Sequence, residues 1–186
     1  MGTAKAMLPF GPETMLQRVV RLTSGVVRPV VVVAAADQEL PELPRTVRIV
    51  CDRQPDRGPL EALVVGLRAL AEEEVDAAFI TACDVPLLNP ALIRRIIELS
   101  AGFDAAAPHI DGFYHPLVAV YRTQVLPEAE ALLAADRLRP ALLFDRVHTR
   151  RITTAELTIA DPNLRSLANV NSPADYEAAL AEARFA

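Results

Sequence analysis

The sequence predicts an α/β fold in which a mostly parallel central sheet is covered by helices on both faces. Short runs of β-branched residues alternate with segments of helical periodicity along the 186 residues, the pattern of strand–helix–strand units. Val30–Val33 is a run of four valines, which is typical of a strand buried on both faces of a parallel sheet. No internal repeat or low-complexity linker divides the chain, so we expect a single domain over residues 1–186.

The composition indicates a folded chain with an aliphatic core. Hydrophobic residues make up 52% and charged residues 23%, which excludes a disordered chain. The net charge of −5 disfavours a nucleic-acid partner. No apolar run approaches the roughly 18 residues of a membrane span, and the N-terminal residues lack the apolar stretch of a signal peptide. We therefore expect a cytoplasmic protein with neither a membrane nor a nucleic-acid partner.

The two cysteines are consistent with that compartment. Cys51 and Cys83 each end or follow a run that is typical of a buried strand. Two cysteines cannot form a tetrahedral zinc site alone, and no CxxC or HxxxH spacing supports one. We predict two reduced thiols in the core rather than a disulfide.

The elements of the first half follow from periodicity and from helix-start signals. An apolar stripe predicts a helix over Glu13–Val26. Pro59 after Gly58 begins a second helix, whose leucines reach Leu70. Between and after these helices, apolar runs predict strands at Val30–Ala34, Val47–Cys51 and Ala77–Ala82.

The second half continues the same alternation. Asn89 is a good N-cap residue, and Pro90 suits the first turn of a helix that ends at Leu99. Ser172 and Asp175 mark the start of the last helix. Between them we expect strands at Ala105–Ala107, Leu117–Tyr121 and Val147–Ile152, and helices at Pro127–Ala135 and Pro140–Phe144.

Two aspartates follow predicted strands, where open α/β sheets bind their ligands. Asp84, in Cys83-Asp84-Val85-Pro86, would suit a hard cation such as Mg²⁺, and an ordinary turn accounts for it equally well. Asp52 precedes a loop in which Gly58 allows a ligand to approach the backbone. The helix that begins there would offer free N–H groups to an anion, although a plain strand-to-helix connection also explains this loop.

Other polar residues are weaker candidates. Lys5, near Gly2, could place a point charge on a phosphate, and Asn169 and Asn171 could both donate and accept hydrogen bonds. A solvated lysine and turn-forming asparagines are the simpler explanations. Arg137 and Arg139 form a short basic stretch that fits a solvated face better than a phosphate site. No GxSxG, Walker A or GxGxxG motif is present.

Taken together, these pieces resemble the MobA-like nucleotidyltransferases over nearly the whole chain. The segments that carry the resemblance are Met1-Gly2-Thr3-Ala4-Lys5-Ala6-Met7-Leu8-Pro9-Phe10-Gly11, Asp52, Gly58-Pro59-Leu60, Ala82-Cys83-Asp84-Val85-Pro86-Leu87, His115-Pro116-Leu117 and Asn169-Val170-Asn171-Ser172-Pro173. Each is modest alone, and their order and spacing make them specific together. The resemblance implies a Rossmann-like, three-layer nucleotidyltransferase fold and transfer of GMP from Mg-GTP to the phosphate of molybdopterin, with release of pyrophosphate.

The resemblance also implies roles for individual residues. Gly2 and Lys5 would lie at the triphosphate, and Asp84 would hold Mg²⁺. The nucleotide would lie against Asp52 and the Gly58-Pro59-Leu60 turn, and the acceptor side would be formed by Asn169, Asn171, Arg137 and Arg139. No side-chain nucleophile is required, because the acceptor phosphate itself attacks. The resemblance leaves open whether other cofactor-biosynthesis proteins hand the acceptor over.

The N-terminus departs from the family pattern. The family signature begins with a strand and a glycine-rich loop of the form LAGGxSxRMG, and this sequence starts at the Met-Gly inside it. We expect the first strand and the glycine loop to be missing from these 186 residues. The strands that flank a missing central strand would then have unpaired edges and exposed apolar surface.

Two alternatives remain at this point. A related transferase would use CTP on the same cofactor, or would activate a sugar phosphate. A non-catalytic member of the family would bind a nucleotide without turnover; the incomplete signature favours it, and the presence of Lys5 and Asp84 argues against it.

Overall fold

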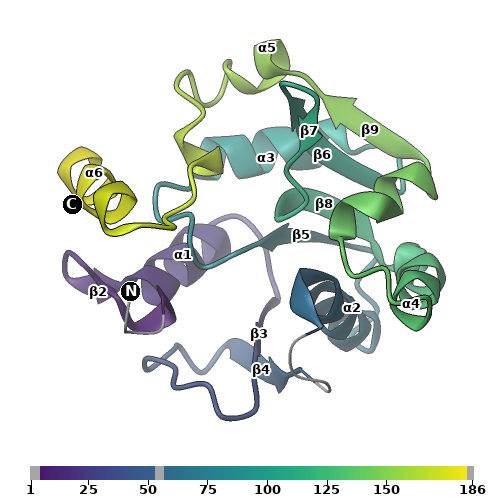
Figure 1. Ribbon diagram of the computed structural model, residues 1–186, viewed down its shortest axis with the longest axis horizontal. Helices are drawn as coiled ribbons and strands as arrows, with labels where there is room; N and C mark the ends of the chain where they lie inside the picture. Colours follow the sequence, from purple (N-terminus) through teal and green to yellow (C-terminus); the bar gives the residue numbers. More distant parts are fainter. Residues whose placement is uncertain (1–4, 53–56, 184–186) are drawn as a thin grey trace.

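The computed structural model describes residues 5–52 and 57–183, which form a central sheet between helices (Figure 1). The chain begins with the 3₁₀ helix η1 (Lys5–Met7) and a hairpin of β1 (Pro9–Phe10) and β2 (Glu13–Thr14). Helix α1 (Met15–Ser24) follows at once, capped by a reciprocal pair of hydrogen bonds between Thr14 and Gln17. The predicted helix over 13–26 is therefore too long at its start, because Glu13 and Thr14 belong to the hairpin.

Strand β3 (Val30–Ala34) pairs in parallel with β4 (Val47–Cys51), and Val30 lies opposite Val47 in this pairing. Helix α2 (Gly58–Ala71) then leads to β5 (Ala77–Thr81). All of these elements lie where the sequence predicts them. However, β3 and β4 form a sheet of their own, and β5 belongs to another.

The larger sheet is mixed, so the expectation of a mostly parallel central sheet is wrong. Its order is β5, β8 (Val118–Arg122), β6 (Ala105–Ile110) and β7 (Phe113–Tyr114), and β9 (Thr149–Ile152) also pairs with β6. Strand β8 is antiparallel to both β5 and β6, whereas β9 is parallel to β6. The chain turns back from β6 through β7 to β8 without a helix, and such a short return joins antiparallel strands.

Helices cover both faces of this sheet, which confirms the three-layer arrangement (Figure 1). On one face, α2 and α4 (Leu126–Ala134) pack through Leu67 and Leu132. On the other, α3 (Pro90–Leu99) packs through Leu92 and Ile96. The remaining elements are η2 (Thr123–Val125), η3 (Pro140–Asp145), α5 (Thr154–Leu157), η4 (Arg165–Leu167) and α6 (Pro173–Glu182).

The cysteines are free, as predicted, but they are not both core thiols. Cys51 is exposed at the end of β4, and Cys83 is partly buried just after β5. Burial raises the pKa of the Cys83 thiol, and the nearby charge of Asp84 raises it further. None of the helices described here is long and apolar enough to cross a membrane.

Candidate active site

Three segments that are distant in sequence meet around the side chain of Lys5. Its ammonium group donates to Asp84 Oδ2 at 3.1 Å and to Asn171 Oδ1 at 2.7 Å. Lys5 comes from η1, Asp84 from the turn after β5, and Asn171 from the approach to α6. The structure therefore brings together three of the residues that the sequence singled out.

Backbone contacts fix the Asp84 turn from two sides. The N–H of Val170 donates to the carbonyl of Asp84 at 2.8 Å. From α1, the guanidinium of Arg18 donates to the carbonyl of Pro86 at 2.7 Å. These bonds hold the turn against both α1 and the segment that carries Asn171, so the carboxylate of Asp84 has a defined position.

Asp175 orients Asn171 on the other side of the cluster. Its carboxylate accepts the backbone N–H groups of Asn171 at 3.0 Å and Ser172 at 2.8 Å. Hydrogen bonds with Ser172, and then with Asn171, hold the pKa of Asp175 below its usual range. From the sequence, Asp175 is predicted only as part of a helix start. The Ser-x-x-Asp spacing was the signal, because a capping box aims that carboxylate back at the residues before the helix.

The free oxygen of Asp84 suits a cation. Oδ1 of Asp84 is buried and has no hydrogen-bond partner within residues 5–52 and 57–183, an arrangement that costs free energy unless a ligand completes it. In the same part of the chain, no three His, Cys, Asp or Glu side chains cluster as a metal cage. One carboxylate is compatible with Mg²⁺ that takes its other ligands from phosphates and water.

Asp52 has a similar environment at the end of β4. Its backbone N–H donates to the carbonyl of Ala34 at 2.8 Å, and its Oδ1 is buried without a partner among the described residues. Burial, and then the negative charge of Glu61, raises the pKa of Asp52. A neutral hydrogen-bond donor of a ligand would satisfy this oxygen.

The turn at the start of α2 is open to solvent. Gly58, at φ +67°, and Pro59 are exposed, whereas Leu60 is fully buried in the core. A side chain at residue 58 would be strained in this conformation. Gly58 and Pro59 can therefore face a ligand, and Leu60 acts by packing.

The remaining candidates are spread more widely. Asn169 is exposed two residues before Asn171, and Gly2 lies outside the described residues. Arg137 and Arg139 are exposed in the connection from α4 to η3. Asp136 belongs to the same connection, and its Oδ1 lies 3.8 Å from Nη2 of Arg57, the residue before α2. Within residues 5–52 and 57–183, no hydrogen bond or ion pair joins Arg137 or Arg139 to Asn169 or Asn171.

The fold is that of nucleotidyltransferases. A structure from Archaeoglobus fulgidus, solved as molybdopterin-guanine dinucleotide biosynthesis protein A, superposes with a TM-score of 0.78 at 19% identity, over 97% of this chain and 90% of that chain. A 2-C-methyl-D-erythritol 4-phosphate cytidylyltransferase from Thermus thermophilus superposes with a TM-score of 0.68 at 17% identity, over 97% of this chain and 93% of that chain.

The chain belongs to the MobA-like NTP transferase domain family, whose model matches residues 1–150. It is 38% identical to a protein of Mycolicibacterium paratuberculosis named "Probable molybdenum cofactor guanylyltransferase", over 99% of this chain and 90% of that protein. A protein of Mycobacterium tuberculosis with the same name is 36% identical to this chain, over 99% of this chain and 89% of that protein. The resemblance inferred from the motifs is thereby confirmed.

Proposed function

We propose that this chain is a molybdenum cofactor guanylyltransferase, which transfers GMP from Mg-GTP to the phosphate of molybdopterin. The observation that carries the proposal is the cluster of Lys5, Asp84 and Asn171, with one buried oxygen of Asp84 left without a partner among the described residues. The names of the relatives over 99% of the chain support the choice of substrates.

The reaction requires positioning and charge neutralisation rather than a side-chain nucleophile. A phosphate oxygen of molybdopterin attacks the α-phosphorus of GTP, the bond from that phosphorus to the bridging oxygen breaks, and pyrophosphate leaves. Lys5 neutralises negative charge on the triphosphate, and Asp84 holds Mg²⁺, which would supply further charge neutralisation when bound. Asp52 accepts a donor of the nucleotide, beside the Gly58-Pro59-Leu60 turn.

The acceptor lies on the side of Asn171, whose position is set by Asp175. Asn169 and the pair Arg137 and Arg139 complete this side, and Gly2 belongs with the triphosphate. Residues 1–186 act as one domain in this proposal, because Asn171 near one end of the chain completes a cluster begun by Lys5 near the other. The two free cysteines suit the cytoplasm, where thiols stay reduced.

A thermal-shift panel with Mg²⁺ and GTP, CTP, ATP or UTP tests the choice of nucleotide. At 100 times its Kd a ligand adds about 2.7 kcal/mol, which raises the Tm of a chain of this size by roughly 5–10 °C. We expect this shift with GTP alone, and pyrophosphate release once molybdopterin is added. A shift with CTP alone would transfer the proposal to cytidylyl transfer, and a GTP shift without turnover would indicate a binding protein.

A further inference from the structure

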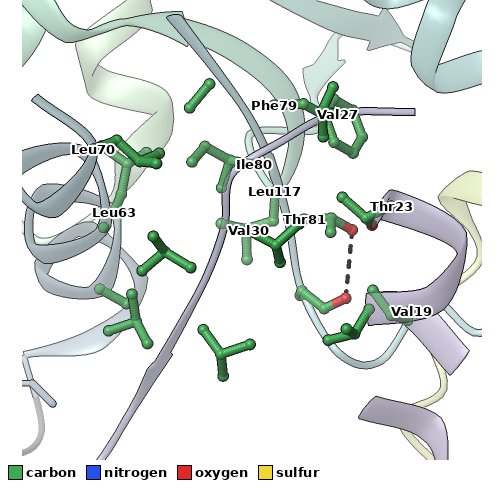
Figure 2. Close-up of a pocket in the computed structure, with 18 of the residues that line it drawn as sticks. Val19, Thr23, Val27, Val30, Leu63, Leu70, Phe79, Ile80, Thr81 and Leu117 are labelled. Carbon is green, nitrogen blue, oxygen red and sulfur yellow. Dashed lines mark hydrogen bonds between the residues drawn. The ribbon is translucent and has the colours of Figure 1, made fainter. Parts of the chain in front are cut away.

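A buried arginine lies in the middle of α1. Arg18 is 8% exposed, although burial of a guanidinium costs free energy unless hydrogen bonds and an opposite charge compensate for it. Burial lowers the pKa of Arg18, and the negative charge of Glu13 acts in the opposite direction. The next residue, Val19, is apolar and lines a cavity of about 610 Å³ (Figure 2). Packing of α1 alone therefore does not explain a charge at residue 18.

The guanidinium of Arg18 joins two segments that flank the candidate active site. Its Nε donates to the carbonyl of Pro86 at 2.7 Å, and its Nη1 pairs with Oε1 of Glu13 at 3.3 Å. The guanidinium carbon also lies 5.1 Å from the centroid of the Phe10 ring. Phe10 and Glu13 belong to the hairpin that follows η1, and Pro86 belongs to the turn after β5. Arg18 therefore fixes these two segments relative to each other.

The bond to Pro86 supports the turn at a point that has little other polar support. Proline has no backbone N–H, and within residues 5–52 and 57–183 the carbonyl of Pro86 accepts from Arg18 alone. Nearby, Val85 and Leu88 are buried in the core. A cavity of about 420 Å³ borders Leu87–Pro90, and Arg18 forms part of its wall. A segment beside a cavity moves more easily than one that is packed on all sides, so the hydrogen bond from Arg18 limits this movement.

The position of this turn decides what the two oxygens of Asp84 face. Oδ2 accepts from Lys5 at 3.1 Å, whereas Oδ1 is buried without a partner among the described residues. The two oxygens are chemically equivalent, so a shift of the turn or a rotation of the carboxylate would change which of them is open. Binding of a metal ion therefore depends on the groups that orient Asp84 as well as on the carboxylate itself.

We propose that Arg18 is a positioning residue for the metal ion: through the carbonyl of Pro86 it holds the turn so that Oδ1 of Asp84 stays open to Mg²⁺. This role rests on the proposed function, in which Asp84 holds the Mg²⁺ that accompanies GTP. Arg18 touches neither the ion nor the substrate, and it acts on metal binding only through the turn.

The test measures how much a metal ion strengthens the binding of GTP, without turnover. Isothermal titration gives the Kd for GTP in EDTA and again in excess Mn²⁺, and the ratio of the two values is the metal-dependent gain in affinity. Arg18→Met removes the donors and keeps a long side chain. We expect the gain to fall at least about ten-fold while the Kd in EDTA changes by less than about two-fold. A general loss of structure would instead weaken GTP binding under both conditions.

Arg21→Met is the matched control. Arg21 lies in the same helix and pairs with the same Glu13, at 2.6 Å, but in the described part of the chain no hydrogen bond joins it to the turn at Pro86. We expect this variant to keep the metal-dependent gain. An equal loss in both variants would show that the ion pair with Glu13 is responsible, and a folded Arg18→Met with the full gain would show that the bond to Pro86 is dispensable. Either result would overturn the proposal.

A second variant keeps the proposal testable if circular dichroism shows Arg18→Met to be unfolded. Arg18→Lys retains the positive charge beside Glu13, but a single ammonium group does not reproduce the two donor directions of the guanidinium. We expect its metal-dependent gain to fall at least about three-fold. A folded Arg18→Lys with the full gain would overturn the proposal.

Asp84→Asn, which removes the metal-binding charge itself, separates this inference from the proposed function. If Asp84→Asn loses the gain and Arg18→Met keeps it, the role of Arg18 fails and the metal role of Asp84 stands. If Asp84→Asn keeps the gain, or if the unaltered chain shows none, the metal role of Asp84 fails and the role of Arg18 fails with it.

Discussion

The ammonium group of Lys5 lies 2.7 Å from the side-chain oxygen of Asn171, a residue 166 positions further along the chain. The same nitrogen lies 3.1 Å from Asp84 Oδ2. Lys5 thus links the start of the chain, the turn after β5 and the approach to α6. Substitutions of these residues test separately how the cluster contributes to binding the nucleotide, the metal ion and the acceptor.

Asp84→Asn should abolish transfer while the fold is retained. The amide removes the negative charge that would hold Mg²⁺ but keeps the shape of the side chain, so we expect kcat to fall by about 10²–10³-fold. Pyrophosphate release measures kcat, and circular dichroism checks the fold. Asp145→Asn, at an exposed position in η3, is the matched control. Full turnover in Asp84→Asn would reject the metal role of Asp84.

Lys5→Met should lower kcat/KM for GTP strongly and change the free energy of unfolding only slightly. The Lys5–Asp84 pair is partly exposed, with side-chain exposures of 33% and 16%, so its loss should change the free energy of unfolding by under about 1 kcal/mol. We expect kcat/KM for GTP to fall about 100-fold, because the substitution removes the positive charge that Lys5 would place against the triphosphate. Steady-state kinetics at saturating acceptor provide the measurement. A variant with kcat/KM intact would exclude Lys5 from phosphate binding.

The acceptor side is tested by comparing Asn171→Ala with the double variant Arg137→Gln/Arg139→Gln. Each should raise KM for molybdopterin about ten-fold and leave the Kd for GTP unchanged. Higher salt should reproduce the effect of the double variant, because both arginines are exposed. The control is Arg45→Gln/Arg94→Gln, which removes two exposed charges elsewhere. If only Asn171→Ala raises KM, the arginines form a solvated surface.

Glu13→Gln should lower stability at neutral pH and have no effect in acid. Glu13 forms ion pairs with Arg18 at 3.3 Å and Arg21 at 2.6 Å, and the hydrogen bond from Arg21 is the main cause of its lowered pKa. A carboxylate with a lowered pKa stabilises the fold above its ordinary pKa of 4.5, and this contribution disappears as the pH falls through the folded value.

We expect the variant to lose about 1–2 kcal/mol at pH 7. Urea unfolding of both proteins across the pH range should show the curves converging below pH 4.5, the ordinary value for Glu13. The control is Glu98→Gln, whose partner Arg95 lies 2.7 Å away but whose own side chain is 69% exposed. A pH-independent difference would show that Glu13 acts by packing rather than by charge.

The sequence by itself determined the local elements. The valines of β3, the Asn89 cap with Pro90, and the Ser172–Asp175 capping box gave correct positions for a strand and two helix starts. These signals depend on periodicity and on hydrogen bonds between residues a few positions apart. The motifs around Lys5, Asp84 and Asn171 likewise predicted the family, because their order and spacing along the chain make them specific together.

Only the tertiary structure decided which strands are neighbours. It placed β8 between β5 and β6 as an antiparallel strand, and it put β3 and β5 in different sheets, with a cavity of about 610 Å³ lined by residues of both strands. It also set the distance from Lys5 to Asn171 and gave Asp175 its role in orienting Asn171. Pairings of this kind join residues many positions apart, and they are decided by packing and by competition among strand edges, which no local pattern records.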